Sequence, residues 1–119
     1  MGELRTAAAL AAAGWRIHRI AEHFPDDGQK TSDPEWIRFG VGQGWTLLTQ
    51  DLRIRYRADE LAAVHDSAGI MFGLANGNLT ISQKVDWFLA NRAAIHTAAS
   101  ASGPVLYRIY ADHITKIWP

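Results

Sequence analysis

The sequence predicts an α/β fold: a central, mostly parallel sheet flanked by helices in three layers. Helix-like and strand-like segments alternate along the chain, which is typical of parallel strands joined by right-handed crossovers. Two of the strand segments are almost continuously apolar, as expected of strands that are covered on both faces. The 119 residues are 48% hydrophobic, which is enough for a core. We therefore expect residues 1–119 to form a single domain.

A helix and a strand are expected first. Residues Glu3 to Ala13 are rich in alanine, the best helix former, and Gly14 ends this helix. Trp15 to Ile20 then alternates apolar and basic residues with the period of a strand. Folds of this type usually begin with a strand, so a chain that begins with a helix indicates that the first strand is absent from these residues.

A polar loop, Ala21 to Ser32, leads into the second helix. Asp33-Pro34-Glu35 opens that helix with an aspartate at the N-cap, a proline at the first helical position and an acid in the first turn. Gly42 and Gly44 stop it. Trp45 to Thr49 follows as a strand-length apolar run, and we expect a buried strand there.

The second half continues the alternation. Apolar spacing predicts a helix from Ala58 to Ser67 and one long helix from Thr80 to Ala98. Between them lies a short buried strand, Gly69 to Ala75. Two closing strands, Pro104 to Tyr110 and His113 to Trp118, are expected with a turn near Asp112.

Composition excludes several classes of protein. The chain has 12 basic and 12 acidic residues, so its net charge of zero argues against a protein that wraps nucleic acid or binds membranes through a basic surface. It has no cysteine, which excludes disulfides and thiol catalysis and fits a reducing cytoplasm. The longest apolar run, Thr6 to Gly14, is too short to span a bilayer.

Two aspartates are the main candidates for chemistry. Asp51 closely follows a strand, and Asp33 begins the helix after another strand, so both are expected at the carboxyl edge of the sheet. Two carboxylates there repel each other unless a hard cation such as Mg²⁺ lies between them. The simpler explanations stay open: Asp33 caps a helix, and Asp51 occupies a turn.

The chain resembles the PIN-like domains of VapC-type toxins. The resemblance is carried by the segments "SDPEWIRFG", "GWTLLTQD" and "RIRYRADE", and it continues through "IMFGLANGNLT" and "GPVLYRIYAD". It covers nearly all of the chain after Leu10. It implies a PIN-like α/β fold and a Mg²⁺- or Mn²⁺-dependent endoribonuclease, a hydrolase of RNA phosphodiester bonds in a toxin–antitoxin system. It also implies three partners, namely an RNA substrate, a cognate antitoxin protein and a second copy in a homodimer.

The resemblance assigns metal ligands residue by residue. Asp33 matches the family's acid that opens the helix, Asp51 matches the acid after the "TxD" strand, and Glu35 is a further candidate on the same helix turn as Asp33. The family's first strand ends in an aspartate, and nothing before Gly14 matches it. The next strand is followed by asparagines rather than an acid. The acidic set is therefore incomplete in these residues.

Basic residues beside this edge suit an RNA substrate. If the segment after Asp51 is extended, Arg53, Arg55 and Arg57 share one face and can bind phosphates, with Tyr56 available for stacking. Thr49 is a candidate to orient the Asp51 carboxylate or a metal-bound water. A solvated arginine face and an ordinary strand threonine are the competing interpretations.

Three functions are candidates for these residues. The first is the metal-dependent endoribonuclease. The second is a non-catalytic PIN-like module that binds a partner protein, which the zero net charge and the incomplete acidic set favour. The third, a phosphoryl-accepting receiver domain, lacks paired acids after a first strand. The five histidines have no HxH or HxxxH spacing, so they predict no zinc site.

Overall fold

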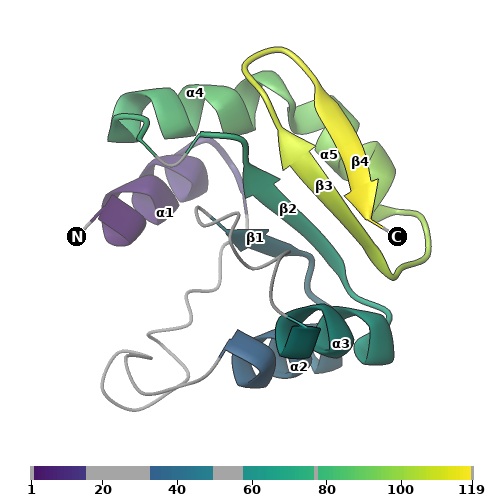
Figure 1. The fold of residues 1–119 in the computed structure, drawn as a ribbon. Helices are drawn as coiled ribbons and strands as arrows, with labels where there is room; N and C mark the ends of the chain where they lie inside the picture. Colours follow the sequence, from purple (N-terminus) through teal and green to yellow (C-terminus); the bar gives the residue numbers. More distant parts are fainter. Residues whose placement is uncertain (1, 16–32, 50–57, 77, 119) are drawn as a thin grey trace.

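The computed structural model describes residues 2–15, 33–49, 58–76 and 78–118. Five helices and four strands are found in these residues (Figure 1). The helices are α1 (Gly2–Ala12), α2 (Asp33–Gly42), α3 (Ala58–Ser67), α4 (Ile81–Ala90) and α5 (Arg92–Ala99). The strands are β1 (Leu47–Thr49), β2 (Ile70–Leu74), β3 (Val105–Ile109) and β4 (Ile114–Trp118).

The strands form one sheet in the order β1-β2-β3-β4. β1, β2 and β3 are parallel, and β4 runs antiparallel to β3. The predicted central, mostly parallel sheet is therefore confirmed. The registers align Thr49 with Gly73 and Gly73 with Arg108, so these three residues form one row across the parallel strands.

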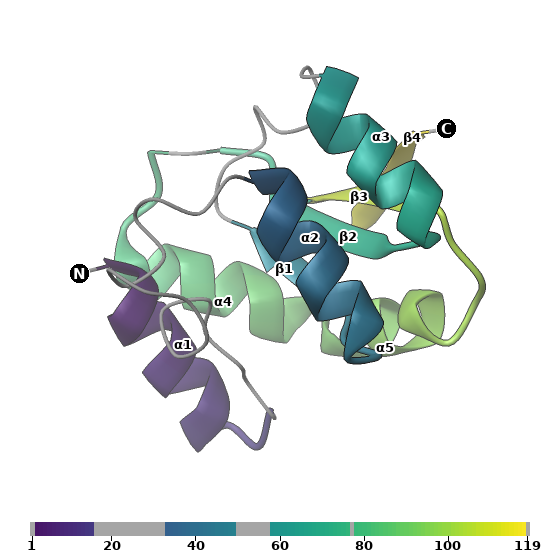
Figure 2. The same cartoon turned by 90° about the horizontal axis from the view of Figure 1, so that it is seen from below.

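Helices cover both faces of the sheet, as predicted, and each face has its own core (Figures 1 and 2). On one face α2 and α3 pack on the strands. This core contains Ile37, Leu47, Ala63, Val64, Met71 and Leu106, all buried. On the other face α1, α4 and α5 pack on alternate strand positions. That core contains Leu10, Phe72, Leu74, Phe88, Ile95 and Ile109.

A tight turn reverses the chain between α2 and β1. Gly44 has a φ of +80°, and the Trp45 N–H donates to the Gly40 carbonyl at 3.0 Å, which closes the end of the helix. Gly40 packs directly on Leu47, because a Cβ built at Gly40 would lie 2.7 Å from a methyl carbon of that side chain. The beginning of α2 therefore lies towards the edge of the sheet where β1 ends.

Most predicted elements are found with shifted ends. Gly14 ends α1 with a φ of +100°. The predicted strand Trp15 to Ile20 lies outside the described residues except for Trp15, which packs edge to face on Phe88 with ring centroids 6.3 Å apart. β1 begins at Leu47 rather than Trp45, because the Trp45 N–H is used by the turn after α2.

The prediction of one long helix from Thr80 to Ala98 is wrong. A capping box between Thr80 and Gln83 starts α4 as expected, but Asn91 separates α4 from α5. Asn91 is 3% exposed, and its side-chain amide donates to the Trp87 carbonyl at 2.8 Å and to the Tyr110 carbonyl at 2.7 Å. The helix breaks there because this one side chain joins the end of α4 to the end of β3.

Candidate functional site

The carboxyl ends of three parallel strands meet at one edge of the sheet. β1 ends at Thr49, β2 at Leu74 and β3 at Ile109. Because the chain reverses between α2 and β1, the start of α2 at Asp33 faces the same edge. In an open parallel sheet this edge is where side chains for binding and catalysis gather. We call it the carboxyl edge.

Only part of the predicted acidic site lies within the described residues. Asp33 begins α2, as predicted from its role as an N-cap, but its side chain is outside what the structure describes. Asp51, two positions after the last residue of β1, is also outside, as are Arg53, Arg55 and Arg57. The approach of the Asp33 and Asp51 carboxylates to within 4–5 Å, as roughly expected for ligands of one ion, therefore stays a prediction.

Glu35 and Thr49 lie at the same edge. Glu35 is exposed in the first turn of α2. Thr49 is half-buried at the last position of β1. Alternation along the strand places Thr49 on the same face as Leu47, which packs under α2. Both residues thus belong to elements that begin or end at the carboxyl edge, and their roles stay predictions.

The end of β2 supplies amides in place of an acid. Asn76 and Asn78 are exposed, and the Asn78 backbone N–H donates to Oδ1 of Asn76 at 2.8 Å. This hydrogen bond forms an Asx turn just past the strand. The sequence has asparagines instead of an acid after this strand, and in the structure Asn76 has a local role, since its side chain forms the turn.

A cationic and aromatic cluster at the end of β3 was missed by the sequence reasoning. Arg108 donates from Nη1 to the Tyr110 hydroxyl at 3.3 Å. The Tyr110 ring stacks on His113 with centroids 4.6 Å apart and planes 9° apart. The "YRIYAD" segment contained the signal, because residues two apart in a strand share a face. We call Arg108, Tyr110 and His113 the β3-end cluster.

Asp112 fixes the orientation of the stacked histidine. Nδ1 of His113 lies 2.7 Å from a carboxylate oxygen of Asp112. The hydrogen bond and the electrostatic interaction with His113 lower the pKa of Asp112, which is exposed. Asp112 therefore stays ionised at neutral pH and contacts one edge of the imidazole, whose side chain is more than half exposed.

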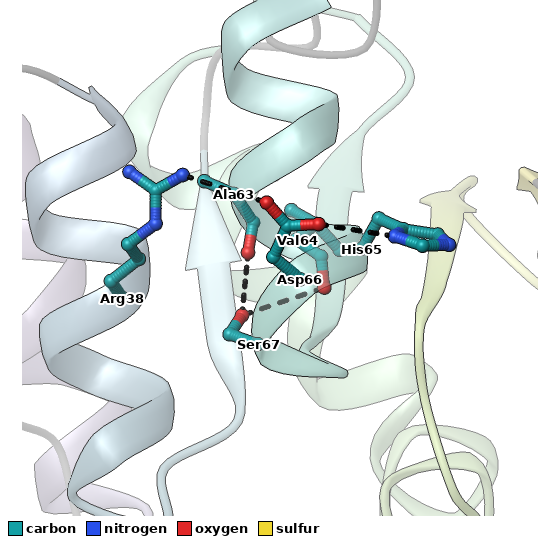
Figure 3. Close-up of polar contacts among 6 residues, drawn as sticks. All are labelled: Arg38, Ala63, Val64, His65, Asp66 and Ser67. Atoms are coloured by element: carbon teal, nitrogen blue, oxygen red, sulfur yellow. Dashed lines mark hydrogen bonds and ion pairs between the residues drawn. The ribbon is translucent and has the colours of Figure 1, made fainter.

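A second polar cluster lies where α2 and α3 are neighbours (Figure 3). Arg38 on α2 lies 3.9 Å from Asp66 on α3, and His65 lies 3.3 Å from the same carboxylate. The Ser67 hydroxyl donates to the Ala63 carbonyl at 2.6 Å. The charged side chains are more than half exposed, so the ion pairs contribute little. α3 ends here and the chain enters β2, so this cluster is at the amino edge, away from the candidate site.

Within residues 2–15, 33–49, 58–76 and 78–118, no group of three or more histidine or acidic side chains is arranged to hold a metal ion. Of the predicted metal ligands, the structure describes the side chain of Glu35 but not those of Asp33 and Asp51. Their donors are all carboxylate oxygens, from Asp33, Glu35 and Asp51. Oxygen donors brought to the end of a strand and the start of a helix suit Mg²⁺ or Mn²⁺. The residues therefore fit such an ion.

Comparison with known proteins shows the family. The sequence pattern described as "PIN like domain" matches residues 2–76, which is more than half of the chain. The chain belongs to the PIN-like domain family. The matched segment includes both predicted aspartates and ends two residues after β2.

The likeness of this PIN-like domain extends along the whole chain. It is 28% identical over 118 residues to a Mycobacterium tuberculosis H37Rv protein named "Putative ribonuclease VapC45", covering 98% of this chain and 86% of the relative. No solved structure matches the chain significantly. Of the helices described in this PIN-like domain, none is both long and apolar enough to cross a membrane.

Proposed function

We propose that this PIN-like domain is a Mg²⁺- or Mn²⁺-dependent endoribonuclease of a toxin–antitoxin system. The observation that carries the proposal is the topology of the carboxyl edge. The helix opened by Asp33 and the strand that leads to Asp51 converge there within a PIN-like fold. The printed name of the M. tuberculosis relative, a ribonuclease, supports the same reaction.

In the proposed reaction Asp33, Asp51 and Glu35 hold the ion. When bound, the ion lowers the pKa of a water molecule and neutralises charge on the scissile phosphate. Thr49 orients the Asp51 carboxylate from the end of β1. Arg53, Arg55 and Arg57 hold the phosphates of a single RNA strand, and Tyr56 stacks on a base.

The proposal includes the setting in which this reaction occurs. The protein acts in the cytoplasm, a cognate antitoxin protein binds it, and two copies form a homodimer. The alternative function is a non-catalytic PIN-like module that binds a partner protein, which the absence of an acid after β2 favours.

Metal-dependent RNA cleavage tests the proposal. We expect Mn²⁺ and Mg²⁺ to raise the melting temperature of the protein, because a ligand that binds only the folded state stabilises it. We also expect saturable cleavage of labelled single-stranded RNA, lost in EDTA. Asp51→Asn should abolish the metal-induced shift and lower the cleavage rate by roughly 100-fold, since it removes a charged ligand.

Two further variants make this test specific. Asp33→Asn keeps an equally good N-cap, so it should lose the metal effects while its metal-free melting temperature is unchanged. Asp86→Asn removes an exposed carboxylate from α4, on the other side of the sheet, and should behave as the wild type. If metal has no effect on the wild type and Asp51→Asn changes nothing, the nuclease is refuted and the binding module takes its place.

A further inference from the structure

We propose that the β3-end cluster is a binding subsite for one nucleotide of a single-stranded RNA. In this subsite Arg108 binds a phosphate, and the exposed ring of His113 stacks on a base. The inference rests on the proposed ribonuclease function, because both assume that RNA binds at the carboxyl edge. It adds residues beyond the segment that the PIN-like family pattern matches.

The sheet register places Arg108 beside the candidate site. Leu106 belongs to the core under α2 and α3, so Arg108, two residues later, lies on that same face. Its row contains Gly73 and then Thr49. The Cα atoms of Thr49 and Arg108 are therefore two strand spacings apart, roughly 10 Å. Gly73 is buried and has no side chain to stand between them.

Hydrogen bonding and stacking fix the position of the guanidinium. The Tyr110 hydroxyl, which accepts from Arg108 at 3.3 Å, holds the side chain towards the carboxyl edge. Tyr110 is in turn held by its stack on His113 and by the Asn91 amide on its carbonyl. A planar guanidinium held in one orientation suits phosphate oxygens, which it can bind by paired hydrogen bonds.

The aromatic stack is the second recognition element. Its two rings are nearly parallel, and the His113 side chain is 57% exposed. A base placed on the outer face of His113 would extend the stack. Single-stranded RNA is recognised by this combination of base stacking and phosphate contact. The Asp112 carboxylate contacts Nδ1 at the edge of the His113 ring, so its negative charge lies beside the ring and not over the face on which a base would stack.

The test is RNA binding measured by fluorescence anisotropy with labelled oligouridylate, with Ca²⁺ in place of Mg²⁺. We expect Arg108→Gln to weaken binding about tenfold and to reduce the salt dependence by about one counterion, because it removes one phosphate contact. His113→Ala should weaken binding about tenfold with the salt dependence unchanged, because it removes stacking alone. His113→Phe should bind as the wild type.

Three further variants make the test specific. Lys116→Gln removes an exposed positive charge on β4, paired with Tyr107 on the opposite face of the sheet, and should have little effect. Tyr110→Phe keeps the stack and removes the hydroxyl that accepts from Arg108, so it should reproduce part of the Arg108→Gln effect with an unchanged melting temperature. Arg108→Lys keeps the charge and should retain the salt dependence at reduced affinity.

The outcomes separate this proposal from the nuclease. If Arg108→Gln and Lys116→Gln bind RNA equally well while the wild type cleaves it, the subsite is refuted and the nuclease stands. If RNA binding depends on Arg108 and His113 but metal causes no cleavage, the nuclease fails and the subsite stands. If the variants bind RNA normally and instead lose a co-expressed antitoxin, the cluster is a protein interface and the proposal is overturned.

Discussion

Asn91 is a buried polar residue whose two hydrogen bonds connect different parts of the fold. Its amide donates to the carbonyls of Trp87 in α4 and of Tyr110 just after β3. Buried carbonyls need such partners, because an unsatisfied polar group away from water is costly. One side chain therefore both ends a helix and holds the strand end that carries the β3-end cluster.

We expect Asn91→Ala to lower the free energy of unfolding by about 1–3 kcal/mol, because it leaves two carbonyls without this donor in a buried site. Urea denaturation at neutral pH measures the change. Asn78→Ala is the matched control: it removes an exposed side chain and keeps the backbone N–H that donates to Asn76. Equal denaturation midpoints for the two variants would show that the Asn91 hydrogen bonds are not important for stability.

At the scale of elements, glycines decide where helices and strands approach one another. A Cβ at Gly103 would lie 2.5 Å from the carbonyl oxygen of Gly69 and would also overlap the backbone of Ala68. These atoms are backbone and cannot rotate away. The close approach brings the segment before β3 against the start of β2, where the Val105 N–H donates to the Gly69 carbonyl at 3.0 Å.

We expect Gly103→Ala to destabilise the protein by about 2–4 kcal/mol, within the range of overpacking and backbone clashes. Gly42→Ala is the matched control at the last residue of α2, where a Cβ meets nothing within 4 Å. That variant should be neutral or stabilised by up to about 1 kcal/mol, since alanine favours the helix. Thermal denaturation compares them, and a tolerated Gly103→Ala would contradict the packing described.

At the scale of the molecule, the two helical layers give the sheet separate cores and leave the carboxyl edge available for a site. Among the described strands β1 pairs with β2 alone, so it is the last strand on its side of the described sheet. A strand in that position can pair with a further strand, either from this chain or from a second copy.

The resemblance to VapC-type toxins implies a homodimer, so we expect residues 1–119 to self-associate. The incomplete acidic set predicts weak Mg²⁺ binding and weak RNA cleavage. Light scattering should give twice the 13.2 kDa of one chain. Adding a preceding strand that ends in aspartate should raise both Mg²⁺ affinity and cleavage, because a third carboxylate adds charge to the site. Calorimetry measures the affinity. A monomer with a tight Mg²⁺ site in residues 1–119 would contradict this prediction.

Local signals in the sequence determined most of the elements. The aspartate, proline and glutamate that open α2 and the apolar spacing of α3 predicted Asp33–Gly42 to within one residue and Ala58–Ser67 at both ends. These signals are local because caps and helical periods involve residues within one or two turns. The same signals, with the family resemblance, predicted that Asp33 opens a helix, which is confirmed, and that Asp33 and Asp51 meet at one edge of the sheet, which stays a prediction.

Tertiary structure alone decided the start of β1, the break at Asn91 and the surroundings of Arg108. Trp45 is apolar enough for a strand, but its N–H closes the turn after α2. Asn91 breaks a helix by contacting a carbonyl 19 residues later in the chain. Arg108 lies in the same row as Thr49 through a register between strands far apart in sequence. Such pairings depend on which segments fold against each other, which no local pattern of residues determines.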